Sequence, residues 1–126
     1  SKDISYRITL GNDLRLDFLE ELDLISIVGN LLDNALEAAE KTKDGRYVEC
    51  RMYMGNEEHF LVMEFCNGYV VPLLKDKDRY ISTKRDADSH GIGLHTVGKL
   101  VKKYAGIMRV EAGEREFSVK LIFTIK

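Results

Sequence analysis

Residues 29–40 read GNLLDNALEAAE, and this stretch carries most of the information about the fold. Its leucines and alanines recur at helical spacing, which is typical of a helix that lies on a sheet. Asn30 and Asn34 lie one turn apart on the other face of that helix. Asparagine is unfavourable inside a helix because its amide competes for backbone hydrogen bonds, so the pair suggests a use for amide oxygens. The alternative, an ordinary solvated helix face, stays open on this stretch alone.

The pattern around this stretch predicts an α+β fold, a two-layer α/β sandwich with helices on one face of a mixed, mostly antiparallel sheet. The long helix covers residues 20–41, and a second amphipathic helix begins at Gly93 and stops at Gly106. We expect strands at residues 4–10, 14–17, 46–54, 59–66, 107–111 and 117–125. The apolar face of the long helix is predicted to contain Leu24, Ile25, Val28, Leu31, Leu32, Ala35, Leu36 and Ala39, with Ile27 on the shoulder of the polar stripe.

Length and composition restrict the class of protein. The 126 residues fit one domain, 1–126, and the net charge of -2 gives no electrostatic reason to expect nucleic-acid binding. No apolar run approaches the ~20 residues that span a bilayer. The chain opens at Ser1 without a signal peptide, so we expect a monomeric fragment of a longer protein, located in the cytoplasm. Cys50 and Cys66 fall in predicted strands, where reduced core thiols are expected, and no cysteine pair has zinc-site spacing.

A second informative segment follows a stretch without periodicity. Residues 90–94 read HGIGL, and glycines let backbone N–H groups approach an anion closely where a helix begins. Lys84 would supply a positive charge to terminal phosphates. Each feature has a plain alternative: a loop-to-helix turn for the glycines, a loop residue for His90, and the exposed helix face for His95.

The chain resembles the ATP-binding catalytic domain of bacterial sensor histidine kinases. The resemblance rests on the order of four segments: the asparagine helix, two strands, a long irregular loop, and a helix that begins with Gly-x-Gly-Leu. The wider GHKL family includes gyrase and MutL. Residues 30–35 match its asparagine box, and residues 91–94 match its second glycine box. The resemblance implies the Bergerat fold and binding of ATP with Mg²⁺. The amino-acid sequences of these motifs look most like those of the kinases that sense peptide pheromones in quorum sensing.

The resemblance also implies a role for each matching residue. Asn34 would coordinate Mg²⁺, and Asn30 would contact phosphate or metal beside it. Residues 68–90 would form a mobile lid that carries Lys84, the third catalytic candidate. The nucleotide would further contact the glycine-box residues His90, Gly91, Ile92, Gly93 and Leu94.

A further implication concerns the reaction. In the family's ATP-hydrolysing members a glutamate base occupies the place of Asn30, and a neutral amide cannot take a proton from water. We therefore expect transfer of the γ-phosphate to a histidine on a separate dimerisation domain, and from there to a response regulator. No histidine here precedes an acidic residue as the family's acceptor does, so the acceptor is expected upstream of Ser1.

The chain departs from the family pattern at the first glycine box, Asp-x-Gly-x-Gly. Asn67 stands at the place of the aspartate, and its amide oxygen would accept a hydrogen bond from the adenine amino group more weakly. Tyr80 is the nearest match to the phenylalanine of the lid. Two alternatives stay open: a serine kinase of the anti-sigma type, and a degenerate docking module without catalysis.

Overall fold

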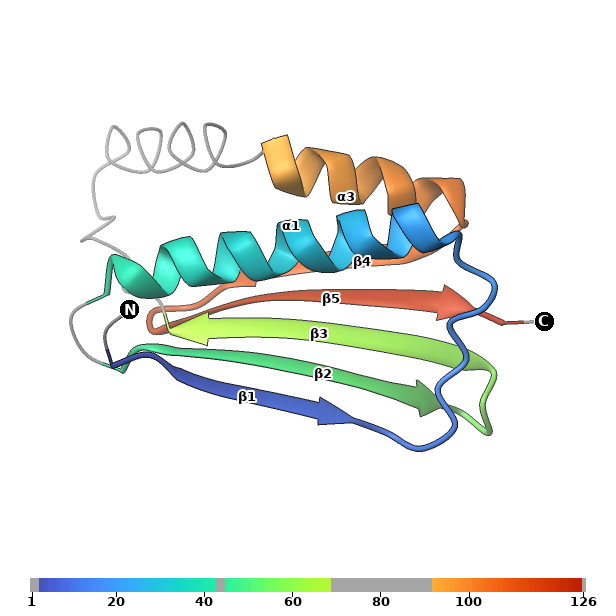
Figure 1. Ribbon diagram of the computed structural model, residues 1–126, viewed down its shortest axis with the longest axis horizontal. Coiled ribbons are helices and arrows are strands. Elements are labelled where there is room, and N and C mark those ends of the chain that lie inside the picture. The colour runs from blue at the N-terminus through green and yellow to red at the C-terminus, as the bar shows by residue number, and fades with distance from the viewer. Residues whose placement is uncertain (1–2, 43–44, 69–91, 126) are drawn as a thin grey trace.

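A computed structural model of the chain describes residues 3–42, 45–68 and 92–125. It contains two helices and five strands within these ranges (Figure 1). In chain order they are β1 (Ser5–Leu10), α1 (Glu21–Glu40), β2 (Tyr47–Gly55), β3 (Phe60–Gly68), α3 (Ile92–Lys103), β4 (Ile107–Ala112) and β5 (Glu116–Thr124). No helix in the described ranges has the length and apolar character needed to cross a membrane.

The strands form one sheet in the order β1-β2-β3-β5-β4. Strand β1 pairs with β2 in parallel, and the other three pairs are antiparallel. Both helices lie on the same face of the sheet (Figure 1). The predicted two-layer α+β architecture with a mixed, mostly antiparallel sheet is therefore confirmed.

Helix α1 buries a stripe with a spacing of four residues, which faces the sheet: Ile27, Leu31, Ala35 and Ala39. Two residues depart from the predicted apolar face. Ile25 was expected in the core and is 60% exposed, whereas Ile27, expected on the polar shoulder, is fully buried. The helix is rotated about its axis relative to the prediction, because it has apolar residues on more than one side.

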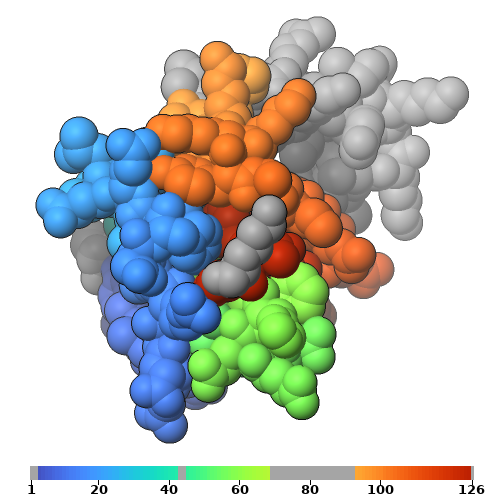
Figure 2. Space-filling view, turned by 90° about the vertical axis from the view of Figure 1, so that its right-hand side faces the viewer, coloured from blue at the N-terminus to red at the C-terminus, as the bar shows by residue number. Residues whose placement is uncertain are grey.

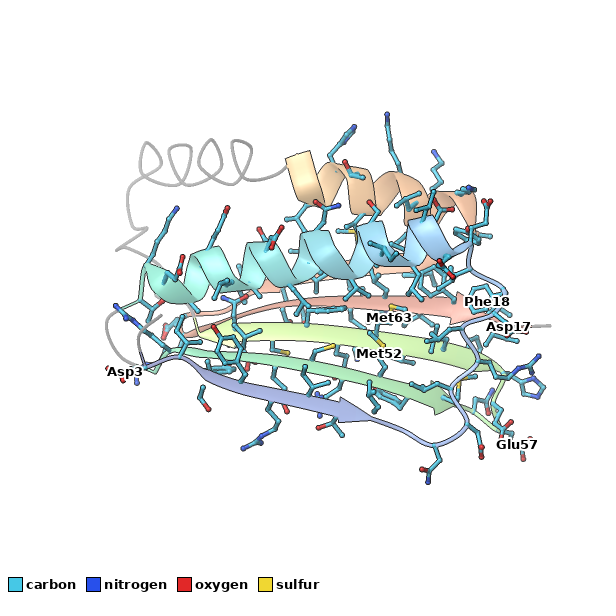
Figure 3. The ribbon with its side chains drawn as sticks, viewed as in Figure 1. Asp3, Asp17, Phe18, Met52, Glu57 and Met63 are labelled. Atoms are coloured by element: carbon cyan, nitrogen blue, oxygen red, sulfur yellow. The ribbon has the colours of Figure 1, made fainter. Side chains whose placement is uncertain are left out.

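The core lies between α1, α3 and the sheet. Strand β2 alternates, with Val48, Cys50 and Met52 buried on the helix side, whereas every residue of the central strand β3 after the half-buried Phe60 is buried. Met52 and Met63 are register partners and lie beneath the helix layer (Figure 3).

The strand predicted at residues 14–17 is absent from the structure, where this stretch is irregular. Its alternation has another cause, because Leu14 and Leu16 are half-buried and pack against the core while Arg15 and Asp17 are exposed. Asp17 and Phe18 follow at the end of the sheet, just before α1 (Figure 3).

The end of α3 also differs from the prediction. The helix ends at Lys103, and Ala105, rather than Gly106, adopts the left-handed conformation with φ of 57°. The N–H of Gly106 donates to the carbonyl of Val101 at 2.8 Å, and that of Ala105 donates to Lys102 at 3.0 Å. This pair of bonds is a Schellman motif, which satisfies carbonyl groups left free at a helix end.

Candidate functional site

The site is built on the flank of α1 that faces α3. Asp23, Asn30 and Asn34 share this flank because their spacing returns them to one side of the helix. Asp23 contacts the last turn of α3, and Asn30 lies against its first turn. The two helices therefore lie side by side in opposite directions (Figure 1).

Asn30 is half-buried and has a defined orientation. Its Nδ2 donates to the backbone oxygen of Ser26 at 2.8 Å and to the Ser26 Oγ at 3.2 Å. With the nitrogen turned toward Ser26, the Oδ1 atom faces α3, where a Cβ built on Gly93 would lie only 3.1 Å from it. The absence of a side chain at Gly93 therefore leaves room for the amide of Asn30. The structure thus brings the asparagine motif and the glycine motif into contact.

Asn34 lies one turn further along α1 and is half-buried. Its side chain makes no hydrogen bond to another described residue, so its amide oxygen is available to a ligand. The described ranges contain no group of three or more histidine, cysteine, aspartate or glutamate side chains that would hold a metal ion. Amide oxygens are hard ligands of the kind that Mg²⁺ takes together with water and phosphate oxygens. The donors on this flank therefore fit a phosphate-bridging Mg²⁺ site.

Helix α3 begins next to the Asn30 amide. The first N–H groups of a helix have no intrahelical partner and favour an anion. Leu94 is half-buried and packs against the core, which fixes the position of this first turn. His95 is exposed, as predicted. Helix α3 includes Ile92.

Several predicted site residues lie outside the described ranges: Lys84, His90, Gly91, the lid at 68–90 beyond Gly68, and the lid candidate Tyr80. Their roles stay predictions.

Asn67 lies at the far end of α1 from Asp23. It is 1% exposed, and its Nδ2 donates to the carbonyl of Gly68 at 2.9 Å. The Thr42 hydroxyl, just past the end of α1, donates to the same carbonyl at 3.5 Å. A side chain at Gly68 would overlap the carbonyl oxygen of Gly45, so glycine is required there by a close backbone approach. The structure therefore places Asn67 in the interior under the last turn of α1, apart from the contact between Asn30 and Gly93.

A charged cluster, the Asp23 cluster (Glu20, Asp23, Lys103 and Tyr104), joins the start of α1 to the end of α3. The Nζ of Lys103 lies 2.7 Å from both Asp23 Oδ2 and Glu20 Oε1. The Tyr104 hydroxyl donates to Asp23 and accepts the N–H of Glu20 at 3.0 Å. The hydrogen bonds from Lys103 and then Tyr104 lower the pKa of Asp23. Figure 2 shows these two helix ends, blue and orange, next to each other at one end of the molecule.

The sequence reasoning placed Asp23 on the polar stripe but missed its partners. Helix charge preferences alone explain an acidic first turn of α1 and a basic last turn of α3, so nothing in the pattern pairs the two. Ser26 was also missed, although a hydroxyl one turn before Asn30 is a signal that could have found it.

The two cysteines are free and buried, as expected for core thiols. Burial raises the pKa of Cys66 to about 11, with further contributions from Glu116 and Glu64. Burial also raises the pKa of Cys50. Both side chains are therefore neutral thiols at physiological pH and are poor metal ligands or nucleophiles.

Residues 19–124 match the family described as GHKL domain. The sensor histidine kinase DpiB of Escherichia coli is 34% identical over 98 residues, which cover 74% of this chain and 18% of DpiB. A probable C4-dicarboxylate sensor kinase of Halalkalibacterium halodurans is 33% identical over 107 residues, 82% of this chain and 19% of that protein. The sensor histidine kinase CitA of Klebsiella pneumoniae is 32% identical over 96 residues, 74% of this chain and 17% of CitA. The chain thus spans about a fifth of the length of these relatives.

Solved structures share the fold at low sequence identity. The histidine kinase domain of a blue-light activated kinase from Erythrobacter litoralis superposes with a TM-score of 0.70 at 17% identity, over 98% of this chain and 52% of that chain. The catalytic domain of histidine kinase ThkA gives a TM-score of 0.63 at 15% identity, over 96% of this chain and 79% of that chain. The predicted Bergerat fold is confirmed.

Proposed function

This chain belongs to the GHKL domain family, and we propose that it is the ATP-binding catalytic domain of a two-component sensor histidine kinase. In this proposal the domain transfers the γ-phosphate of ATP to a histidine on a separate dimerisation domain of the same protein. The observation that carries the proposal is the contact between Asn30 on α1 and Gly93 on α3. It brings the Asn30 amide oxygen to the start of α3, with Asn34 one turn further along α1, and amide oxygens and a helix start are the groups needed around a triphosphate and its cation.

Asn34 is the proposed Mg²⁺ ligand, and Asn30 contacts phosphate or metal beside it. Bound Mg²⁺ would neutralise charge on the phosphate oxygens during transfer. The lack of a hydrogen bond from the Asn34 side chain to any residue that the structure describes supports its role, since a ligand residue must not be engaged elsewhere. The orientation of Asn30 supports a polar contact through its oxygen, because its nitrogen is bonded to Ser26.

The amide chemistry of Asn30 supports transfer rather than hydrolysis. A hydrolytic site needs a group that takes a proton from water, and the Asn30 amide has no such capacity. The domain is therefore proposed to hold ATP in position until the acceptor histidine arrives.

Further contacts are proposed from the sequence. Lys84, on a lid at residues 68–90, would neutralise the terminal phosphates, and His90, Gly91, Ile92 and Leu94 would complete the phosphate cradle with Gly93. The Asn67 amide oxygen would accept a hydrogen bond from the adenine amino group, since its Nδ2 already donates to the Gly68 carbonyl. The chain would act as one domain, 1–126.

The partners follow from the proposed reaction. The phosphohistidine would pass its phosphate to the aspartate of a response regulator, in the cytoplasm. The isolated chain is proposed to be monomeric and unable to phosphorylate itself. Labelling with [γ-³²P]ATP should give no stable phosphohistidine on it, and acid-stable label on an added protein would instead favour a serine kinase.

The amino-acid sequences of the asparagine box and the second glycine box support a parent kinase that senses a peptide pheromone. One of the three relatives above is named as a probable C4-dicarboxylate sensor, which makes a small carboxylate the competing signal. The parent's response to a secreted peptide and to dicarboxylates, measured by its phosphohistidine level, separates the two.

Thermal melts with nucleotide test the site directly. Wild-type chain should gain about 2.7 kcal/mol of stability with Mg²⁺–ADP, or a non-hydrolysable ATP analogue, at about 100 times the dissociation constant. Asn34→Ala should lose the Mg²⁺-dependent part of this gain. Asp33→Ala, its exposed neighbour on α1, is the matched control and should respond like wild type. Absence of any shift in the wild-type chain at millimolar nucleotide would overturn the proposal.

A further inference from the structure

Helix α1 carries a second apolar stripe besides the one that faces the sheet. Its residues alternate at spacings of three and four: Leu22, Ile25, Gly29, Leu32 and Leu36. Leu22 is 79% exposed and Ile25 is 60% exposed, while Leu32 and Leu36 are half-buried. Alternating spacings of three and four are typical of the seam between two packed helices.

The second stripe lies on the side of α1 away from α3. Asp23 and Asn30 define the flank that faces α3, and α3 itself contacts β4 at one edge of the sheet. Helix α1 contacts β2 and β3, so its other flank is directed toward β1 at the opposite edge. The stripe is therefore on the side where the helix layer does not extend over the sheet (Figure 1).

Strand β1 adds apolar side chains on the same side. Tyr6, Ile8 and Leu10 are 61%, 66% and 58% exposed. Their register partners on β2 are residues buried beneath α1, namely Val48, Cys50 and Met52. Because partners in register project to the same face, the β1 side chains project to the helix-bearing face. Together with the α1 stripe they form what we call the α1–β1 apolar surface.

Gly29 lies in the middle of this stripe and has no role within the described structure. A Cβ at Gly29 would meet no other atom within 4 Å, so no neighbour requires its absence. Glycine inside a helix is unfavourable relative to alanine. A glycine between apolar residues of a helix seam lets the backbone of another helix come close, which accounts for a residue that otherwise only weakens α1.

The charges beside the stripe decide between possible occupants. Helix α1 contains no lysine or arginine, and Glu21, Asp33 and Glu40 are exposed on it. Two copies of α1 side by side would bring these carboxylates together, which disfavours self-association. A helix with lysine or arginine beside its apolar stripe would instead be complementary.

We propose that the α1–β1 apolar surface is the docking site of a basic amphipathic helix from the remainder of the parent kinase. This inference rests on the proposed function only in assuming that the chain is part of a longer kinase. The occupant packs its apolar stripe against Ile25 and Leu32, crosses α1 most closely at Gly29, and covers Tyr6, Ile8 and Leu10.

Thiol accessibility in the full-length parent kinase tests the proposal. Ile25→Cys reports on the surface, and Lys99→Cys, exposed on α3 at the other flank of α1, is the control. The native Cys50 and Cys66 are buried and give the background. Labelling of Ile25→Cys by a maleimide should be about tenfold slower in the parent than in the isolated chain, as for a surface covered in roughly nine-tenths of molecules. Lys99→Cys should label equally in both.

A second variant, at Gly29, tests whether the docked helix packs closely against α1 at that residue. Gly29→Leu should leave the melting temperature of the isolated chain no lower, since the position is open, yet restore rapid labelling of Ile25→Cys in the parent. Cross-linking from Ile25→Cys should capture a parent helix flanked by lysine or arginine. Equal labelling in parent and isolated chain would overturn the proposal. So would protection in an isolated chain that is dimeric, or protection that requires another protein. None of these readouts depends on nucleotide binding, so failure of the proposed ATP site would appear separately, in the thermal melts.

Discussion

The amide oxygen of Asn30 lies 3.1 Å from the position that a Cβ on Gly93 would occupy. The two residues belong to different helices and to two separate sequence motifs. Contacts this close are tighter than ordinary van der Waals packing, so α1 and α3 approach at this point only because Gly93 has no side chain. The geometry of the proposed phosphate site therefore depends on the absence of one methyl group.

Gly93→Ala should separate stability from binding. The new methyl group would displace the Asn30 amide, and we expect nucleotide affinity to fall about tenfold, or about 1.4 kcal/mol. Gly98→Ala on the same helix is the control, because its Cβ would meet only the Met108 Sδ at 3.9 Å. That variant should bind like wild type and gain about 0.5–1 kcal/mol of stability from helix propensity. Calorimetric titration with Mg²⁺–ADP measures both, and equal affinity in the two variants would contradict the role of Gly93.

Periodic segments were predicted well from the sequence, and the errors have physical causes. The two helices and the strands β2 and β3 follow from hydrophobic spacing, and the structure has them within a few residues of the prediction. The exchange of Ile25 and Ile27 arose because α1 has two apolar stripes, and a helical wheel does not tell which one faces the sheet. Residues 14–17 alternate like a strand, but their leucines anchor a loop to the core.

For the site, sequence and resemblance named both members of the Asn30–Gly93 pair. They did not predict how the two helices are held. The bonds from Lys103 and Tyr104 to Asp23 connect residues far apart in the chain. Such pairings depend on how α1 and α3 pack, which no local pattern encodes.

The Asp23 cluster should make stability depend on pH in the acid range. Hydrogen bonds from Lys103 and then Tyr104 lower the pKa of Asp23, so folding is favoured when this carboxylate is charged. This contribution is complete above the unfolded pKa of about 3.9 and is lost as the pH falls through the lower folded value. Asp23→Asn should therefore be less stable than wild type at pH 7, and the two should converge once the pH has fallen through the lower folded pKa of Asp23.

Urea midpoints measured at several pH values test this prediction. Asp33→Asn, on the same helix but exposed, is the control and should follow wild type across the range. A constant difference between Asp23→Asn and wild type down to the lowest pH would show that the loss arises from packing rather than from the charge.

Glu64 is a buried carboxylate on the face of the sheet opposite the helices. Burial alone raises the pKa of Glu64, but hydrogen bonds from Tyr53 and Lys120 and the charge of Arg51 outweigh it, so its pKa is lowered. Glu64→Gln would remove the charge from these three partners, and we expect a loss of about 1–2 kcal/mol at pH 7. Glu49→Gln is the control, since Glu49 lies 4.0 Å from the exposed Arg7 and such pairs contribute about 0–1 kcal/mol. Chemical denaturation of both variants should give clearly different midpoints, and equal midpoints would contradict the role of Glu64.

Ala105→Gly should stabilise the chain. Ala105 has φ of 57° in the Schellman motif after α3, a conformation that costs an L-residue about 1–2 kcal/mol and glycine almost nothing. Part of this gain is offset by the greater freedom of glycine in the unfolded chain, so we expect about 1 kcal/mol. For a domain of this size that corresponds to a rise in melting temperature of roughly 3–6 °C.

Gly106→Ala is the matched comparison for Ala105→Gly. Glycine is required at position 106 by close packing rather than by a left-handed backbone conformation. Its Cβ would lie 2.8 Å from the Phe123 Cδ1 and 3.0 Å from the carbonyl oxygen of Ile122, and a buried ring and a strand carbonyl cannot easily move. We expect a loss of about 1–3 kcal/mol from this crowding. Thermal melts of the two single variants should thus shift in opposite directions. If Gly106→Ala were the neutral or stabilising change and Ala105→Gly the harmful one, the assignment of the left-handed residue to Ala105 would be wrong.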